Sequence, residues 1–237
     1  MGIVVDFHSH VLPGVDDGSA SVKESIAMLQ RMARQGVQQV VATPHFYANH
    51  DSPENFLERR YQAEQRLRRE MADYEGLPEL IVGAEVHFFS GISQSDCLKG
   101  LTIGGKKCIL IEMTDVPWSE SKYQELSDIQ VKRGITPIIA HIDRYISPFR
   151  TLRIPEKLAE LPVLVQANAE FFLQRSTARF ALRLLQQDKI QLLGSDCHNL
   201  TSRPPNLGEA LAVIERRLGS PVLDRISSYG QDVLISD

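Results

Sequence analysis

Histidine and acidic residues follow short apolar segments of this chain, at positions typical of the downstream ends of buried strands. The residues in this pattern are Asp6, His8, His10, Asp17, His45, Glu85, Glu112, His141, Asp196 and His198. Imidazole and carboxylate groups together are suitable ligands for Mn, Fe or Zn. Because the ends of parallel strands meet at one face of a βα barrel, residues far apart in sequence would converge there. The pattern predicts a multinuclear metal-dependent hydrolase.

Taken singly, these residues have plainer interpretations. His8 and His10 are two apart and would point the same way on a strand, but such pairs are common. Asp17 lies in a glycine-containing turn and could be a turn residue. Glu85 and Glu112 each follow an apolar run, where a buried carboxylate must be paired or bind a metal. Their shared position at strand ends is what favours the metal interpretation.

Two arginines follow predicted metal ligands. Arg144 lies three residues beyond His141, and Arg203 lies five beyond His198. A guanidinium group binds phosphate oxygens in a bidentate manner, so the pair indicates a phosphoryl substrate. The alternative is a pair of surface salt bridges. Among other polar residues near strand ends, His87 could contact substrate or be simply exposed, and Asn168 could orient a ligand or a water.

A different phosphatase mechanism is also open, since Cys197 and Arg203 have the Cys-x5-Arg spacing of a thiolate phosphatase. That mechanism needs a loop of backbone N–H groups around the phosphate and a thiol of lowered pKa. The five intervening residues include no glycine, and Pro204 and Pro205 follow where a helix would begin. We therefore expect the spacing to be coincidental and Arg203 to serve the metal site.

Strand-like and helix-like segments alternate along the chain. The predicted strands are residues 3–7, 39–43, 80–84, 108–112, 137–141, 163–167 and 191–195. The predicted helices are a segment from Val22 to before Gly36, then residues 53–74, 120–133, 154–160, 176–187, 206–217 and 221–227. Ser21 and Glu24 form a capping box for the first helix, and Pro53 follows Ser52 at the start of the second.

This alternation predicts an α/β fold, with seven parallel strands closed into a distorted, TIM-like (β/α)7 barrel. An open doubly wound sheet fits the same spacing. No change of composition divides residues 1–237, so we expect a single domain. Residues 88–107 have no strong periodicity and are the expected irregular insertion.

Composition excludes several classes of protein. The net charge of −4 leaves no basic excess to neutralise nucleic-acid phosphates. Three cysteines without paired spacing indicate a reducing compartment. No apolar run approaches the length of a membrane span, and the first residues do not resemble a signal peptide. We expect a cytoplasmic protein with no membrane insertion and no nucleic-acid partner.

The chain resembles the PHP (polymerase and histidinol phosphatase) superfamily and, within it, the manganese-dependent tyrosine-protein phosphatases of bacterial capsule and exopolysaccharide operons. The resemblance spans nearly the full length. The segments that carry it are Asp6-Phe7-His8-Ser9-His10, Pro13-Gly14-Val15-Asp16-Asp17-Gly18, Ala42-Thr43-Pro44-His45, Gly83-Ala84-Glu85, Ala140-His141-Ile142-Asp143-Arg144-Tyr145, Gly194-Ser195-Asp196-Cys197-His198-Asn199 and Ser202-Arg203-Pro204-Pro205. The chain departs from the usual pattern at Asp143, where relatives carry glutamate, and at Cys197, where they often carry alanine or methionine.

The resemblance implies a seven-stranded barrel with three metal ions, Mn or else Fe or Zn. It implies that Arg144 and Arg203 bind phosphate, and that a metal-bound hydroxide attacks phosphotyrosine. The implied metal ligands are His8, His10, Asp17, His45, Glu85, Glu112, His141, Asp196 and His198. The implied partner is a phosphorylated tyrosine kinase of polysaccharide export.

Two other functions fit the same residues. A small-molecule phosphatase, acting on histidinol phosphate or a sugar phosphate, would use the same metals and arginines. A metal-binding regulatory subunit would need the ligands without catalysis, although a complete ligand set favours an enzyme. The sequence does not identify the group that protonates the leaving phenolate.

Overall fold

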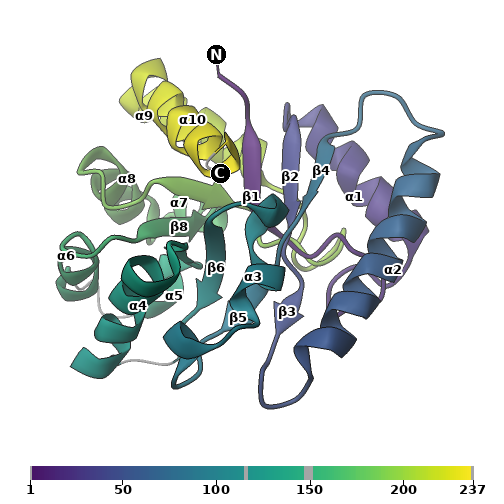
Figure 1. Cartoon of the computed structure of the whole chain (residues 1–237). Helices are drawn as coiled ribbons and strands as arrows, with labels where there is room; N and C mark the ends of the chain where they lie inside the picture. Colours follow the sequence, from purple (N-terminus) through teal and green to yellow (C-terminus); the bar gives the residue numbers. More distant parts are fainter. Residues whose placement is uncertain (1, 115–116, 147–151, 236–237) are drawn as a thin grey trace.

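The computed structural model describes residues 2–114, 117–146 and 152–235, in which parallel strands alternate with helices (Figure 1). Seven strands match the predicted segments to within a few residues. They are β1 (Val5–Ser9), β2 (Gln39–Ala42), β4 (Glu79–Val82), β6 (Cys108–Glu112), β7 (Thr136–Ile139), β8 (Leu164–Asn168) and β9 (Leu192–Gly194). Every pairing between them is parallel, as the α/β prediction requires.

Two short strands that the sequence analysis missed belong to a sheet of six strands with β6 to β9, while β1, β2 and β4 form a sheet of three. β3 (His45–Phe46) continues the line of β2 after Thr43 and Pro44, and β5 (Glu85–His87) continues β4 after Gly83 and Ala84. β3 pairs with β5, and β5 pairs with β6. Pro44 has no N–H to donate, so a break in the ladder at this point is expected. The two interruptions distort the sheet near the ends where the predicted ligands lie.

The sheet closes on itself between its first and last strands. The Asp196 N–H donates to the His8 carbonyl over 2.7 Å, and the His10 N–H donates to the Cys197 carbonyl over 2.9 Å. A parallel bridge joins Ser9 to Cys197. The strands thus form a distorted barrel of seven positions, which confirms the barrel prediction and excludes the open doubly wound sheet.

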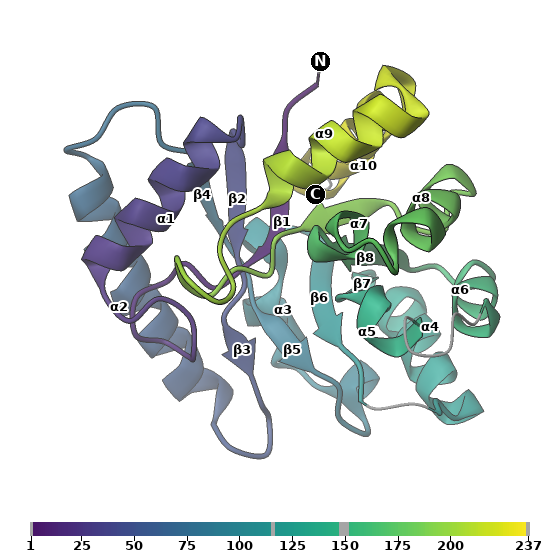
Figure 2. The same cartoon turned by 180° about the vertical axis from the view of Figure 1, so that it is seen from behind.

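Helices cover the outside of this barrel (Figures 1 and 2). They are α1 (Val22–Arg34), α2 (Pro53–Met71), α3 (Leu98–Leu101), α4 (Glu120–Arg133), α5 (Ile142–Ile146), α6 (Arg153–Leu158), α7 (Glu170–Leu173), α8 (Ala178–Gln186), α9 (Leu207–Leu218) and α10 (Ser220–Ile235), with one-turn 3-10 helices at Ile92–Gln94 and Ile103–Gly105. The sequence analysis missed α3, α5 and α7, which are too short for a helical periodicity, and it placed the end of α10 too early. Residues 88–107 hold only short helical turns, as expected of an irregular insertion.

The helix starts follow the predicted capping chemistry. Ser21 accepts the Glu24 N–H over 3.2 Å, while the Glu24 carboxylate accepts the Ala20 N–H over 2.9 Å. Ser52 caps α2 in the same manner, accepting from the Asn55 N–H over 3.2 Å. Each side chain satisfies an N–H that the helix itself leaves without a partner. These caps fix where α1 and α2 begin.

The strands carry apolar residues on both faces, as expected of a parallel sheet covered by helices. Ile109 and Ile111 of β6 belong to the large cluster that packs the helices onto the sheet. Leu110, on the alternate face, joins Ile138 and Leu192 in a smaller cluster inside the barrel. In the part of the chain that is described, no helix is both long enough and apolar enough to cross a lipid bilayer.

Candidate metal centre

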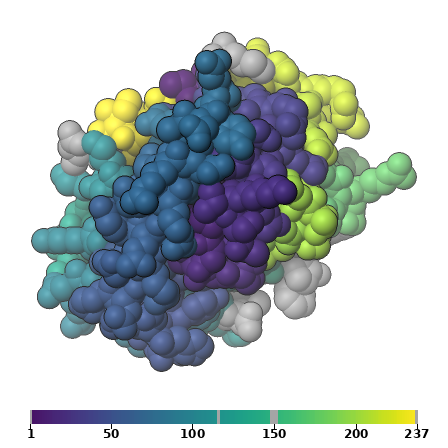
Figure 3. All heavy atoms as spheres, turned by 90° about the vertical axis from the view of Figure 1, so that its right-hand side faces the viewer, coloured from purple at the N-terminus to yellow at the C-terminus, as the bar shows by residue number. Residues whose placement is uncertain are grey.

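The predicted metal ligands all lie at the downstream ends of the strands. His8 is in β1, His45 in β3, Glu85 in β5 and Glu112 in β6. The remaining members lie in loops after β1, β7 and β9, namely His10, Asp17, His141, Asp196 and His198. The loops after β1 and β9 lie side by side on the surface (Figure 3). The barrel therefore brings together residues separated by up to 190 positions.

Four of these side chains surround one point. His8 Nε2 lies 3.2 Å from His10 Nε2, 3.1 Å from Glu85 Oε2 and 3.5 Å from Asp196 Oδ1. His10 Nε2 lies 3.3 Å and 3.4 Å from the same two oxygens. Atoms bound to one ion at about 2.0–2.2 Å in a tetrahedron stand about 3.4 Å apart. The spacing of these four buried side chains fits such an ion.

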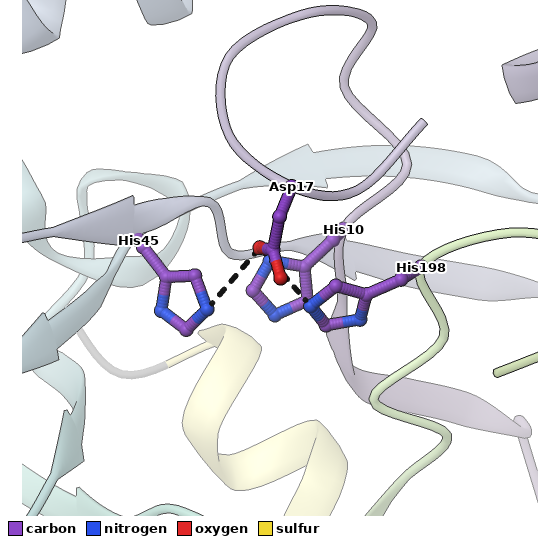
Figure 4. A group of neighbouring side chains, drawn as sticks. All are labelled: His10, Asp17, His45 and His198. Atoms are coloured by element: carbon purple, nitrogen blue, oxygen red, sulfur yellow. Dashed lines mark ion pairs between the residues drawn. The ribbon is translucent and has the colours of Figure 1, made fainter. Parts of the chain in front are cut away.

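A second group of ligand atoms includes His10, Asp17, His45 and His198 (Figure 4). Asp17 Oδ1 lies 3.6 Å from His45 Nε2 and 3.4 Å from His198 Nε2. Asp17 itself is 67% exposed, so this group opens toward solvent. Any ion held by this group would therefore be accessible from solvent.

Glu85 links these two groups to a third. Its Oε1 lies 2.8 Å from His141 Nε2, which is in turn 3.4 Å from Glu112 Oε1. Glu85, Glu112 and His45 together form another set of atoms close enough to share an ion. A single carboxylate thus borders every part of the cluster.

The surroundings of the Glu85 carboxylate suit a bound cation better than direct hydrogen bonds to its histidine neighbours. Its Oε2 lies 3.0–3.3 Å from nitrogens of His8, His10 and His45, yet it forms no aligned hydrogen bond with any described residue. Although burial raises its pKa, the charge of His8 and the nearby nitrogens of His10 and His141 hold that pKa well below its usual range. Glu85 is therefore an ionised carboxylate, the form that binds metal.

His198 is held in the form that a metal requires. Burial and the charge of His10 lower its pKa to about 4, so the ring is neutral near pH 7. Its Nδ1 lies 2.9 Å from the Asp196 carbonyl and donates to it. That bond fixes the tautomer and leaves the lone pair of Nε2 directed at Asp17.

Two side chains that the sequence analysis did not identify orient the first histidines. Asp16, interpreted from sequence only as a turn or cap residue, lies 2.6 Å from His10 Nδ1 and also accepts the His45 N–H over 3.0 Å. Gln166 Oε1 lies 3.2 Å from His8 Nδ1. Partners of this kind hold metal-binding imidazoles in place. Asp16 was detectable as an acid beside Asp17, but nothing in the sequence marked Gln166.

Asp6 does not join the cluster, contrary to its place in the sequence pattern. Its Oδ1 accepts the Ser195 N–H over 2.8 Å and the His8 N–H over 3.3 Å. Burial raises its pKa to about 6 in spite of these bonds. Asp6 is absent from the groups of converging ligand atoms and instead ties β1 to the end of β9.

Both predicted phosphate-binding arginines reach the cluster. Arg144 donates to Asp196 Oδ2 over 2.6 Å and to Glu112 Oε1 over 3.2 Å. Arg203 Nη2 lies 2.8 Å from Asp196 Oδ1. Because Asp196 is only 3% exposed, both arginines pair with a buried carboxylate of the candidate site. The arginines themselves are 41% and 37% exposed, so their outer edges face solvent.

The Cys-x5-Arg interpretation fails on two observations. The Cys197 side chain is fully buried, and burial raises the pKa of its thiol far above the usual range. In the following loop, Asn199 Oδ1 accepts the N–H groups of Thr201, Ser202 and Arg203. These donors are therefore turned toward a side chain rather than toward a phosphate. Cys197 is a core residue.

Neighbouring polar and aromatic residues form the rim of the cluster. His87 Nδ1 lies 3.1 Å from Glu112 Oε2 and is 35% exposed, so it is neither isolated nor fully exposed. The Tyr47 ring lies 5.3 Å from that of His87 and 5.4 Å from that of His45. It also lines a pocket of about 510 Å³ beside Asp17. Asn168 donates to Asp196 Oδ2 over 2.9 Å, as expected of a residue that orients a ligand.

The aspartate at position 143, where relatives carry glutamate, contacts a neighbour of the proposed ligands and not the ligands themselves. Asp143 is half-buried, and its Oδ1 accepts the Asn168 N–H over 2.9 Å. Burial raises its pKa, although the Asn168 bond opposes this. Asp143 therefore acts on the cluster through Asn168 and not by direct contact.

Comparisons with known proteins identify relatives of this chain. The family model described as "Capsular polysaccharide synthesis, CpsB/CapC" matches residues 4–236. The tyrosine-protein phosphatase CpsB of Streptococcus agalactiae is 30% identical over 232 residues, 91% of either chain. The tyrosine-protein phosphatase YwqE of Bacillus subtilis is 31% identical over 226 residues, which are 92% of this chain and 86% of that protein.

A solved structure shows the same fold. It is described as coming from work on YwqE of Bacillus subtilis and CpsB of Streptococcus pneumoniae, "unique metal-dependent tyrosine phosphatases". The two chains superpose with a TM-score of 0.84 at 27% identity, covering 98% of this chain and 94% of the other.

Proposed function

The chain belongs to the CpsB/CapC family of capsular polysaccharide synthesis, and from that membership we propose that it is a metal-dependent protein-tyrosine phosphatase. The observation that carries the proposal is the set of four ligand atoms around one point, with Glu85 shared by the neighbouring groups. The main alternative mechanism needs a reactive Cys197 thiol, which burial opposes.

Three overlapping groups of ligand atoms support a site for three ions. Manganese is the metal we propose, and the same nitrogen and oxygen donors would accept iron or zinc. Bound ions would lower the pKa of a water molecule and neutralise phosphate charge. The proposed ligands are His8, His10, Asp17, His45, Glu85, Glu112, His141, Asp196 and His198.

The protein's own groups would hold the phosphate and its aryl group. Arg144 and Arg203 extend from the buried carboxylates to solvent, where their guanidinium groups would bind phosphate oxygens. The aromatic rim at Tyr47 would pack against the ring of a phosphotyrosine. The phenyl ring of phosphotyrosine would bury more apolar area on Tyr47 than the polar imidazole of histidinol phosphate or a sugar ring, which favours an aryl phosphate.

The physiological substrate we propose is a phosphorylated tyrosine kinase of polysaccharide export. Its support is the family's description in capsule synthesis and the names of the relatives. We also propose that the chain acts in the cytoplasm as one domain spanning residues 1–237.

The test is hydrolysis of a phosphotyrosine peptide by the wild type and by Cys197→Ser, with chelator and again after Mn²⁺ is restored. We expect activity to disappear with chelator, to return with Mn²⁺, and to be similar in the two proteins. Chelator-resistant activity that disappears in Cys197→Ser would contradict the metal mechanism.

A parallel assay with histidinol phosphate separates the two phosphatase functions. We expect a kcat/KM at least about tenfold higher for the phosphotyrosine peptide, since its phenyl ring would bury more apolar area on Tyr47 than the polar imidazole of histidinol phosphate. Tyr47→Ala should narrow that ratio while leaving the metal content unchanged. A higher kcat/KM for histidinol phosphate would favour the small-molecule function, and no hydrolysis of either by the metal-loaded protein would favour a binding subunit.

A further inference from the structure

A groove rich in arginine is lined by residues of α8 and α9. These two helices lie on the side of the barrel away from α1 and α2 (Figures 1 and 2). It encloses about 990 Å³. Phe172, Phe180 and Val213 contribute apolar lining. Five exposed arginines lie along it, namely Arg175, Arg179, Arg183, Arg216 and Arg217.

The charge of this groove is not neutralised locally. No acidic residue is among those that line it. Among the described residues, no carboxylate is within ion-pair distance of any of the five arginines. Glu215, the nearest acid along α9, lines a different pocket on another side of that helix. The whole chain has a net charge of −4, so a cluster of five arginines in one groove stands out. Such a cluster indicates an anionic partner.

The arrangement suits an extended chain better than a flat surface. Arg179 and Arg183 are four residues apart on α8, a rise of about 6 Å. Alternate residues of an extended peptide are about 6.6 Å apart and point the same way. Arg216 and Arg217, in the last turn of α9, provide a second wall. A groove with two walls can surround a peptide, whereas a bilayer would require a protruding surface.

Only a short stretch of chain separates the groove from a residue that contacts the candidate metal centre. Asn168, which donates to Asp196, ends β8, and α7 begins two residues later at Glu170. Arg175 follows the end of α7, and Phe172 of α7 lines the groove itself. Arg175 therefore lies seven residues along the chain from Asn168.

We propose that this groove binds an extended acidic segment of the phosphoprotein substrate, outside the phosphotyrosine itself. The proposal rests on the proposed phosphatase function for the identity of the partner. The recognised chemistry is a run of carboxylates at alternate positions, which guanidinium groups bind in a bidentate manner.

A binding measurement tests the groove without catalysis. Fluorescence anisotropy would follow a labelled peptide of alternating glutamate and serine, added to the wild type at low and high salt. We expect binding that weakens with salt and that falls at least about tenfold in Arg175→Glu/Arg179→Glu. The control is Lys23→Glu/Arg69→Glu, which makes the same change of charge at exposed positions on α1 and α2 and should bind as the wild type does.

A kinetic measurement tests the link to the substrate. Adding the acidic segment to a phosphotyrosine peptide should lower the KM of the wild type about tenfold and leave kcat unchanged. Arg175→Glu/Arg179→Glu should lose this advantage and keep wild-type kinetics on the peptide without the extension. Circular dichroism would confirm that the variant is folded.

Several results would overturn the proposal. One is that the wild type does not bind the acidic peptide. Another is that the arginine variant binds it as tightly as the wild type does. A third is that the KM of the wild type is the same with and without the acidic extension. Arginine-dependent sedimentation with phosphatidylglycerol vesicles, without peptide binding, would assign the groove to a membrane surface instead. Absence of hydrolysis of the unextended peptide would contradict the phosphatase function, and the anisotropy result would then decide the groove separately.

Discussion

At the scale of residues, single side chains outside the proposed ligand set hold the candidate metal ligands in position. Asp16 is the clearest case, because its carboxylate holds both the His10 ring and the His45 N–H. Burial raises its pKa, but hydrogen bonding from His10 and the charge of that ring lower it far below its usual range. Asp16 is thus an ionised carboxylate that contacts the outer ring nitrogen of His10, one of the proposed ligands.

We predict that Asp16→Asn lowers metal affinity by about 10–100-fold, since an amide gives the His10 ring a weaker acceptor. Metal content after dialysis against graded Mn²⁺ would measure this. Asp73→Asn, at an exposed position after α2, is the control and should retain wild-type affinity. Equal metal content in both variants would remove Asp16 from the support of the centre.

The cysteines give a second prediction at this scale. Burial raises the pKa of Cys108 to about 11 and that of Cys197 still higher, so both remain neutral thiols at pH 8. Cys97 is only partly buried. We expect iodoacetamide to modify Cys97 alone in the native protein and all three cysteines in denaturant, as read by intact mass. Native modification of Cys197 would contradict its assignment to the core.

At the scale of elements, the sequence predicted the strands and helices better than the backbone at their junctions. Alternation and caps were sufficient to place all seven main strands. They could not indicate that His141 and Asp196 adopt positive φ values of 32° and 53°. Such conformations are costly for residues other than glycine and tend to occur at functional sites. They depend on tertiary contacts, such as the Gln166 side chain that accepts the His141 N–H over 2.6 Å.

Gly194 illustrates a further limit on what sequence alone reveals. A Cβ on this residue would lie 2.5 Å from His8 Cβ and 2.8 Å from His8 N. The close approach of β9 to β1 therefore requires glycine. We predict that Gly194→Ala destabilises the protein by about 1–3 kcal/mol and lowers its metal content, as measured by denaturant unfolding and metal analysis. Unchanged values would mean that β1 shifts freely.

Helix caps provide a prediction with a matched control. Ser21 caps α1 through its hydroxyl, whereas Ser119 stands at the start of α4 without a side-chain cap bond. We expect Ser21→Ala to cost about 1 kcal/mol of unfolding free energy, and Ser119→Ala to cost much less. Urea unfolding would measure both, and equal losses would show that the capping bond is not the cause.

At the scale of the whole molecule, the parallel barrel was predictable from the alternation of elements. The convergence of the ligands followed from the barrel, since its strand ends share one face. Closure between β1 and β9 was predicted as part of the barrel, although spacing alone also allowed an open sheet. The breaks at Pro44 and Gly83 that create β3 and β5 also depended on how neighbouring strands pair.

Metal removal should therefore affect the entire barrel. The proposed ligands come from β1, β3, β5 and β6 and from loops after β1, β7 and β9, so ions would bind the folded chain and not the unfolded one. A metal at about 100 times its Kd adds about 2.7 kcal/mol of stability. We predict that chelator lowers Tm by about 5–10 °C. His198→Ala should reduce this difference, and a Tm indifferent to chelator would contradict it.

The bond between β1 and the end of β9 has a consequence for synthesis. The first ligands, His8 and His10, leave the ribosome some 190 residues before Asp196 and His198, on which the same group of atoms depends. Non-local contacts of this kind form late. A nascent chain would carry His8, His10 and Glu85 before Asp196 and His198 have been synthesised. The proposed metal site could therefore form only after translation has passed β9.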